Sequence, residues 1–384
     1  MGNIPASVKA ILAERIFDGQ QWHHAAAVLI QNCRILGFTT FNNIHESCEV
    51  ERLPAGVFIA PGFIDIQVNG GGGVLLNATP TAEGMVAIAR AHRPFGTTAL
   101  LPTFITDTQE KTKQIIAAAK SAVGRDGVMG LHLEGPFINP ARAGVHPTEY
   151  IRCPSDGDLE WVRLLANVGC AVITLAPECV PAGFIRTLVS LGIRVWAGHS
   201  EATAEQMHRA IDEGLSGVTH LFNAMPPLRG REPGIIGTTL ADPRLTAGII
   251  MDGLHVSPIS VRAAFAAKGS DRIALVTDAM PTVGANTQQF DLMKRSIYLQ
   301  GGRLVTGEGI LAGAHLDMTS ALRNAIQLAG ISLEDALISA GHTPARSLGL
   351  DRERGTLVTG ARADMIALNQ DLQLVGTWIG GVRQ

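Results

Sequence analysis

The sequence lacks the features that would place the protein in a membrane, outside the cell or on nucleic acid. No apolar run approaches the roughly 18 residues that a membrane-spanning helix needs. The formal net charge of −3 gives no electrostatic reason to expect nucleic acid or an anionic membrane as a partner. The start, MGNIPASVKAILAERIFDG, has no basic segment followed by a sustained apolar stretch, so we expect no secretion signal.

Cysteine is also scarce, which argues against a disulfide framework. The five cysteines are odd in number, scattered along the chain and without a C-x-x-C spacing. They indicate reduced, mostly packing residues in a cytoplasmic protein. Only 17% of the residues are charged whereas 46% are hydrophobic, and 384 residues suffice for one large domain or two smaller ones with a sizeable core.

Glycine, in contrast, is abundant, and the 43 glycines separate short apolar runs from segments with helical periodicity. The helical segments include residues 81–96, 108–124 and 203–214. The continuously apolar runs are typical of parallel strands covered on both faces. Eight such runs, each followed by a helical segment, predict a (β/α)8 TIM-like barrel. The runs are 57–69, 97–103, 127–135, 171–178, 193–200, 217–224, 245–253 and 272–280.

The two ends of the chain have a different pattern of short strands with polar or glycine turns. Neither end is long enough to bury a core of its own. We therefore predict that residues 1–58 and 354–384 pair into one small β-sandwich domain, and that residues 59–353 form the barrel. A further hairpin is expected at residues 295–309.

Polar side chains follow most of the predicted barrel strands. Catalytic groups of such barrels lie at the carboxyl ends of the strands, so we expect these side chains to share one cleft. They are Gln67, Asn69, Glu134, Glu178, His199, His220, Asp252, His255 and Asp278.

Glu134, His199 and His220 form a candidate metal site. Two imidazoles and one carboxylate with an open position are a known catalytic zinc set, and they also suit iron and other divalent metals. Each histidine alone could instead be a hydrogen-bonded core residue. Asp278 is a candidate general base, with a helix cap or a partner that orients a histidine as the alternative. We expect Glu178 to support a ligand residue or to have a structural role, and we assign His132 a packing role.

The motifs PGFIDIQVNG, LHLEGPFI, TLAPE, AGHS, THLFNAM, MDGLHV and VTDAM occur in order between residues 61 and 280. Together with the closing GTLVTGARADMIAL, they resemble the amidohydrolase superfamily and, within it, the N-acetylglucosamine-6-phosphate deacetylases. The resemblance implies a metal-dependent hydrolase that removes acetate from N-acetylglucosamine 6-phosphate and yields glucosamine 6-phosphate. It also implies a homodimer that binds a phosphosugar.

Roles for individual residues follow from the same resemblance. Glu134, His199 and His220 would hold the metal, and Asp278 would act as general base and then as general acid. His146 would stabilise the acetyl oxygen. His255 and Arg231 would bind the phosphate, in part from the neighbouring subunit. The remaining substrate contacts would be Val145, Asn223, Ala224, Leu311, Ala312 and Gly313.

Two positions depart from the wider superfamily. Many relatives carry H-x-H where this chain has Gln67-Val68-Asn69, and neutral amides are poor ligands for a transition metal. We therefore predict one divalent metal per subunit, with zinc first and iron or another divalent transition metal as alternatives. Ala314 and His315 stand where related sequences carry small hydroxyl residues, which leaves open how this segment fits the sugar.

Two other functions compete with this interpretation. Another amidohydrolase acting on a different N-acyl sugar or on a cyclic amide would share the metal site and Asp278. A non-catalytic phosphosugar-binding protein would need neither Asp278 nor three metal ligands, so their joint presence favours catalysis.

Overall fold

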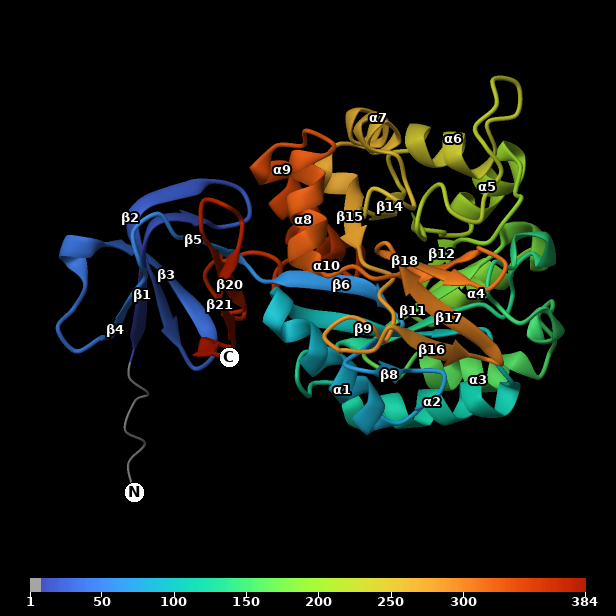
Figure 1. Ribbon diagram of the computed structural model, residues 1–384, viewed down its shortest axis with the longest axis horizontal. Coiled ribbons are helices and arrows are strands. Elements are labelled where there is room, and N and C mark those ends of the chain that lie inside the picture. Colours follow the sequence, from blue (N-terminus) through green and yellow to red (C-terminus); the bar gives the residue numbers. More distant parts are fainter. Residues whose placement is uncertain (1–7) are drawn as a thin grey trace.

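A computed structural model describes residues 8–384, so the predicted role of residues 1–7 in the small β domain lies outside the described part. Eight parallel strands form a barrel in chain order (Figure 1), which confirms the predicted fold class. The strands are β6 (Phe63–Val68), β9 (Thr97–Ile105), β10 (Gly130–Glu134), β11 (Cys170–Leu175), β12 (Arg194–Ala197), β13 (Gly217–Val218), β14 (Thr246–Ile250) and β15 (Ile273–Val276).

Helices cover the outside of the barrel (Figure 1). Three of the predicted helices begin directly after a threonine whose hydroxyl accepts a hydrogen bond from a backbone N–H of the first turn, which stabilises the helix start. These N-caps are Thr81, Thr108 and Thr203. The helices are α1 (Ala82–His92), α2 (Gln109–Ala122), α3 (Asp158–Leu165), α4 (Phe184–Ser190), α5 (Ala204–Asp212), α6 (Gly234–Ala241), α7 (Pro258–Lys268), α8 (Met318–Gln327), α9 (Leu333–Leu337) and α10 (Thr343–Ser347).

The barrel closes where the first and last strands meet. The backbone N–H of Asp278 donates to the carbonyl of Gln67 at 2.9 Å, and that of Asn69 donates to the carbonyl of Ala279 at 2.9 Å. Deeper in the barrel, the buried carboxylate of Asp65 accepts a 2.5 Å hydrogen bond from the hydroxyl of Thr277. Closure thus places the polar ends of β6 and β15 side by side.

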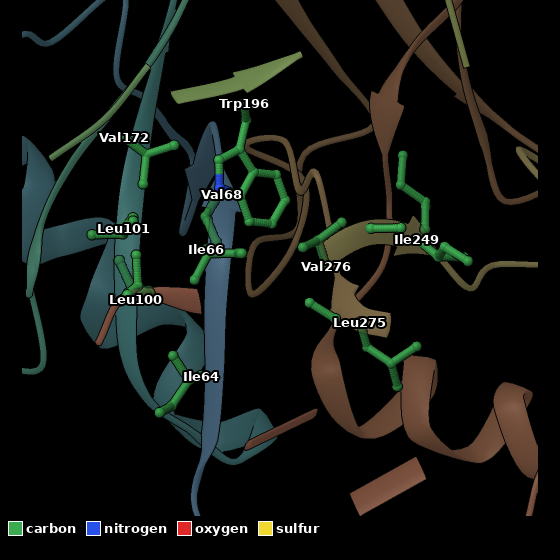
Figure 2. Packing of buried hydrophobic residues seen from close by; sticks show 14 of the residues in the cluster. Ile64, Ile66, Val68, Leu100, Leu101, Val172, Trp196, Ile249, Leu275 and Val276 are labelled. Carbon is green, nitrogen blue, oxygen red and sulfur yellow. The ribbon is translucent and has the colours of Figure 1, made fainter. Parts of the chain in front are cut away.

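Buried hydrophobic side chains, Trp196 among them, pack on both faces of the barrel strands (Figure 2). A Cβ atom at Gly217, which pairs with Trp196 on the neighbouring strand, would lie 2.4 Å from the indole ring. Glycine is therefore required at this position for the indole to pack inside the barrel. The residues shown include Ile64, Ile66, Val68, Leu100, Leu101, Val172, Ile249, Leu275 and Val276.

Strands from both chain ends form one separate sheet (Figure 1). The apolar run at 57–69 is split at Gly62, because its first half joins this sheet as β5 and only its second half enters the barrel as β6. The two-domain division at residues 58/59 and 353/354 stays a prediction. The strands of the sheet are β1 (Lys9–Phe17), β2 (Trp22–Gln31), β3 (Arg34–Thr40), β4 (Glu49–Arg52), β5 (Phe58–Pro61), β20 (Met365–Leu368), β21 (Leu374–Ile379) and β22 (Val382–Arg383).

A small antiparallel sheet follows the last barrel strand, where the sequence predicts only a hairpin. Its final strand reaches the barrel, because Ala314 donates to the carbonyl of Asp278 at 2.9 Å and pairs with Ala279. The strands are β16 (Gln289–Leu292), β17 (Arg295–Gln300), β18 (Arg303–Thr306) and β19 (Leu311–Ala314), and a two-strand ribbon of β7 (Gly70–Gly71) and β8 (Val74–Leu75) lies after β6. None of the helices within residues 8–384 has the length and apolar character that crossing a bilayer requires.

An ion pair with a buried carboxylate anchors the long loop between β10 and α3, which carries His146. Arg152 donates two hydrogen bonds of 2.6 and 2.5 Å to the carboxylate of Asp158, which also accepts from Ser155 and Trp161. The Asp158 side chain is fully buried. Burial alone would raise the pKa of Asp158, but these hydrogen bonds hold it well below its ordinary value.

We expect Asp158→Asn to lower the free energy of unfolding at pH 7 by about 3 kcal/mol, because the substitution leaves Arg152 without its counter-charge. The folded-state pKa is depressed, so the carboxylate stabilises the fold fully above its unfolded pKa of about 3.9 and loses this effect as the pH falls towards the folded value. The difference in free energy of unfolding between wild type and Asp158→Asn should therefore become smaller below about pH 4. Denaturant titrations at several pH values between 7 and 3 measure this difference, and Asp156→Asn, at an exposed position, is the control. Equal stability of Asp158→Asn and wild type at pH 7 would contradict the prediction.

Candidate active site

A cavity of about 520 Å³ lies at the carboxyl ends of the barrel strands. Side chains that follow β6, β10, β12, β13, β14 and β15 border it, together with the loop after β10 and the turn before β19. Its lining comprises Asn69, Ile105, Glu134, Ala141, Arg142, Gly144, Val145, His146, His199, His220, Asn223, Ala224, Ile250, His255, Asp278, Met280, Gly309, Ile310, Leu311 and Gly313.

Glu134, His199 and His220 converge on one point of this cavity. Glu134 Oε1 lies 3.0 Å from His199 Nε2 and 3.0 Å from His220 Nε2, and the two imidazole nitrogens are themselves 3.0 Å apart. Zinc–nitrogen and zinc–oxygen distances of about 2 Å allow atoms at this spacing to share one ion. The three side chains come from non-adjacent parts of the sequence, as the positions of the strand ends predict.

The hydrogen bonding of His199 suits a metal ligand. Its Nδ1 lies 2.7 Å from the backbone carbonyl of Arg142, so Nδ1 carries the hydrogen and donates to that oxygen. In the neutral ring, Nε2 then carries the lone pair that faces Glu134 and His220. Metal-bound histidines are usually oriented in this way.

Three side chains of the cavity share the same backbone position. His199, His220 and Asp278 each stand two residues beyond the last residue of their strand, and their φ angles are +49°, +32° and +51°. Non-glycine residues seldom adopt this left-handed region, and such strain concentrates at functional sites. A packing role would not need the same strained turn at three strand ends, so this observation favours the functional interpretation of all three residues.

Asp278 borders the cavity on the side of β6. Asn69 Nδ2 donates to its Oδ1 at 2.5 Å, and Gln67 Nε2 lies 3.3 Å from the same atom. Burial, and secondly the nearby carboxylate of Glu134, raise the pKa of Asp278 to about 6. A cation bound next to Glu134 would lower it again. Such a carboxyl group can change its protonation state near neutral pH, as a general base must.

Glu134 is fully buried and ionised. Burial would raise its pKa, but the hydrogen bonds with His199 and His220 hold the pKa of Glu134 well below its ordinary value. Burial lowers the pKa of His220, but Glu134 outweighs this effect and raises it. Without a cation, the buried carboxylate therefore depends on its contacts with the two imidazoles.

His146 lies next to this group on the loop after β10. Its ring centroid is 4.4 Å from that of His199, and its Nδ1 is 2.8 Å from the hydroxyl of Thr106. One ligand atom each from Glu134, His146 and His199 also lie within 4.8 Å of one another. Geometry thus offers two overlapping sets of three ligands, and the set that contains His220 is the tighter one.

Most of the residues predicted to contact substrate border the same cavity. They are Val145, Asn223, Ala224, His255, Leu311 and Gly313. Ala312 is fully buried in the same hydrophobic cluster as Met280 and does not line the cavity. Arg231 is exposed in the loop 225–233 and does not line the cavity of its own chain.

Ala314 and His315, which differ from the residues of related sequences, lie outside the cavity lining. Ala314 is buried, and His315 borders a separate cavity where its Nδ1 lies 2.9 Å from the Thr282 hydroxyl. His132 is buried within the barrel. The carboxylate of Glu178 accepts hydrogen bonds from the hydroxyl of Ser200 and the backbone N–H of Glu201, and so holds the turn after His199.

Sequence reasoning missed the side chains that orient the predicted site. The sequence marks Gln67 and Asn69 as strand ends but carries no signal that they donate hydrogen bonds to Glu134 and Asp278. Arg142 and Thr106 carry no signal in the sequence, because their partners approach only when the loop after β10 folds back over the barrel.

Comparison with known proteins agrees with this geometry. The sequence profile of the Amidohydrolase family matches residues 58–383. The chain belongs to the amidohydrolase family. This family is metal-dependent, and the group around Glu134 is the candidate metal site of the present member.

Individual amidohydrolases resemble the chain over most of its length. An N-acetylgalactosamine-6-phosphate deacetylase from Shewanella is 40% identical over 86% of this chain and 84% of the relative. An N-acetylglucosamine-6-phosphate deacetylase from Bos taurus is 36% identical, with the same coverage of both chains. The crystal structure of N-acetylglucosamine-6-phosphate deacetylase from Pasteurella multocida superposes with a TM-score of 0.94 at 32% identity, covering 98% of this chain and 99% of that one.

Metal content separates the two overlapping sets of ligands. We expect Glu134→Ala and His220→Ala to weaken zinc binding by at least about 100-fold. Loss of a residue that only orients a metal ligand already weakens binding by up to about 100-fold, and loss of a ligand itself should weaken it more. His146→Ala should keep one ion per chain. Elemental analysis after zinc loading and dialysis measures this, with His315→Ala as the matched control outside the cavity. If His146→Ala lost zinc as completely as His220→Ala, the metal would belong to the set that contains His146.

Proposed function

We propose that the protein hydrolyses the acetamide of N-acetylglucosamine 6-phosphate to acetate and glucosamine 6-phosphate. One observation carries the proposal. Three convergent ligand atoms, the carboxylate of Asp278 and the imidazole of His146 border a single cavity of a size suited to a small ligand. The deacetylases named among its relatives support the choice of reaction.

Glu134, His199 and His220 would hold one divalent metal per subunit, with zinc as the first candidate and iron or another divalent transition metal as alternatives. Gln67 and Asn69 occupy the positions where a second metal is held in many relatives, but their side-chain N–H groups already donate to Glu134 and Asp278. When bound, the metal supplies Lewis-acid chemistry that lowers the pKa of water towards about 7.

Asp278 would manage the protons of the reaction. An amide is inert because its carbonyl carbon is weakly electrophilic and its amine is a poor leaving group. Asp278 would accept the proton of the attacking water and then deliver it to the amide nitrogen, so that the amine can leave. Asn69 and Gln67 hold the carboxylate in place through its Oδ1.

His146 would stabilise the carbonyl oxygen as it gains negative charge. It lies on the same side of the cavity as His199, and a hydrogen-bond donor placed there acts most strongly where charge develops. Val145, Asn223 and Ala224 would orient the sugar.

His255 and Arg231 would bind the phosphate. The carboxylate of Asp252 lies 2.6 Å from His255 Nδ1 and so holds the imidazole in place. Arg231 is exposed on its loop, and we propose that it reaches the cavity of the neighbouring subunit in a homodimer.

The five cysteines are free thiols, in keeping with a place in the reducing cytoplasm.

N-acetylgalactosamine 6-phosphate is the second candidate substrate. The Shewanella relative that is named for this substrate is 40% identical to the chain. The bovine N-acetylglucosamine-6-phosphate deacetylase is 36% identical. The two sugars differ only in the orientation of one hydroxyl group, and the metal site, Asp278 and His146 would serve both equally.

Removal of the proton acceptor tests the mechanism. We expect Asp278→Asn to keep its fold and its bound metal but to lower kcat by about 10²–10⁴-fold, because an amide cannot accept and return the proton. Acetate release under saturating substrate measures kcat, and elemental analysis of the same sample confirms the metal. An unchanged rate would remove Asp278 from the mechanism.

Substrate comparison tests the specificity. We expect kcat/KM to be highest for N-acetylglucosamine 6-phosphate and about 100-fold lower for unphosphorylated N-acetylglucosamine, since the phosphate contacts would be lost. Chelation should abolish acetate release and added zinc should restore it. Equal rates with and without phosphate would point to a different amidohydrolase, and faster turnover of the galactosamine epimer would select the second candidate.

A further inference from the structure

The imidazole of His146 can serve the reaction in only one of its two neutral forms. A neutral ring has one hydrogen, on Nδ1 or on Nε2. The His146 ring is buried, and its Nδ1 faces the hydroxyl of Thr106. A ring with hydrogen on Nε2 donates to an oxygen in the cavity, whereas a ring with hydrogen on Nδ1 presents a lone pair there.

Thr106 is the side chain that contacts the other nitrogen. It stands directly after β9, its side chain is buried, and its Oγ1 lies 2.8 Å from His146 Nδ1. The same oxygen lies 3.4 Å from the backbone carbonyl of Glu134. A hydroxyl group has one hydrogen and cannot donate to both acceptors. The contact with His146 has an ordinary hydrogen-bond length and the contact with the carbonyl is long, which favours donation to Nδ1.

The backbone of Gly135 leaves the space that this hydroxyl occupies. A Cβ atom at Gly135 would lie 2.1 Å from Thr106 Oγ1, and Gly135 has a φ of +84° that favours glycine. The turn after the metal ligand Glu134 thus fixes the hydroxyl beside His146. Two carboxylates, Glu134 and Asp278, border the same cavity as His146, and an N–H group that faces a carboxylate is preferred to a lone pair.

We propose that Thr106 is a positioning residue that donates its hydroxyl hydrogen to His146 Nδ1, and thereby keeps the ring hydrogen on Nε2 as a donor to the substrate carbonyl. This inference rests on the proposed amide hydrolysis. The hydrogen bond also fixes the ring plane, so the donor is in place before charge develops on the oxygen. In the reverse arrangement Thr106 would accept from Nδ1, and His146 would be a metal ligand through Nε2.

Nitrogen NMR of the zinc-loaded enzyme reads the hydrogen position without any substrate. The protein is labelled with ¹⁵N-histidine, zinc is used because it is diamagnetic, and the loss of one ring's signals in His146→Gln assigns His146. We expect a bare Nδ1 and a protonated Nε2. A protonated Nδ1 would overturn the proposal. Because no turnover is needed, this result stands even if neither phosphosugar is hydrolysed.

A matched pair of variants tests the consequence for the rate. Thr106→Val keeps the shape but removes the hydroxyl, and we expect kcat to fall about 10–100-fold, since a poorly held oxyanion donor loses part of its effect. KM and zinc content should stay within about threefold of wild type, because the interaction acts on the transition state. Thr106→Ser retains the hydroxyl and should recover most of kcat.

Three outcomes of this second test would overturn the proposal. They are equal kcat values for the valine and serine variants, a loss of zinc in Thr106→Val, and a kcat of Thr106→Val equal to that of wild type. Loss of zinc would assign Thr106 to the support of Glu134 instead. Thermal unfolding of both variants shows whether either substitution disturbs the fold. Absence of acetate release from wild type would refute the proposed function and leave the NMR result to decide the hydrogen position.

Discussion

The site depends on the close approach of one carboxylate oxygen and two imidazole nitrogens inside a buried barrel mouth. These atoms are 3.0 Å apart, and each belongs to a side chain that is almost inaccessible to solvent. A buried carboxylate is costly unless positive charge compensates it. Two protonated imidazoles at this spacing would repel each other, so a divalent cation is the more effective partner for all three atoms.

The barrel produces this approach through strand register. Ala197 of β12 pairs with Val218 of β13, and His199 and His220 each follow their strand by the same two residues. Equal offsets from paired residues place the two imidazoles at the same height above the barrel. Glu134, the last residue of β10, reaches the same point from two strands away, across β11. A change in register at any of these strands would separate the three ligands.

Much of this could be predicted because parallel strands have a strong sequence signature. Buried strands are continuously apolar, so an ionisable residue at the end of such a run is conspicuous, and barrel geometry alone brings these ends together. Strand limits were less predictable. β13 contains only two residues, and His220 lies in the turn after it, since the backbone must leave the ladder to aim the side chain inward. The apolar run at 57–69 also gives no sign that the chain passes from one sheet to the other at Gly62.

Loop residues were beyond the reach of pattern reasoning. His146 became a candidate only through family resemblance, because a histidine within a loop has no periodicity that fixes its direction. Its place follows from contacts distant in sequence, such as that with Thr106, 40 residues away, and from the anchoring of the loop by Arg152 and Asp158. Arg231 also lies in a loop, so the sequence can suggest it as a phosphate ligand but cannot predict where its side chain lies.

Charge balance gives the exposed position of Arg231 a physical meaning. Besides the three histidines near Glu134, the lining that residues 8–384 supply to the cavity contains two basic side chains, Arg142 and His255. The guanidinium of Arg142 is paired with Glu201, and the imidazole of His255 already contacts the carboxylate of Asp252. A phosphate dianion would therefore need further positive charge from outside this lining. An arginine on a projecting loop of a second subunit would provide it, and substrate binding would then depend on association of the two chains.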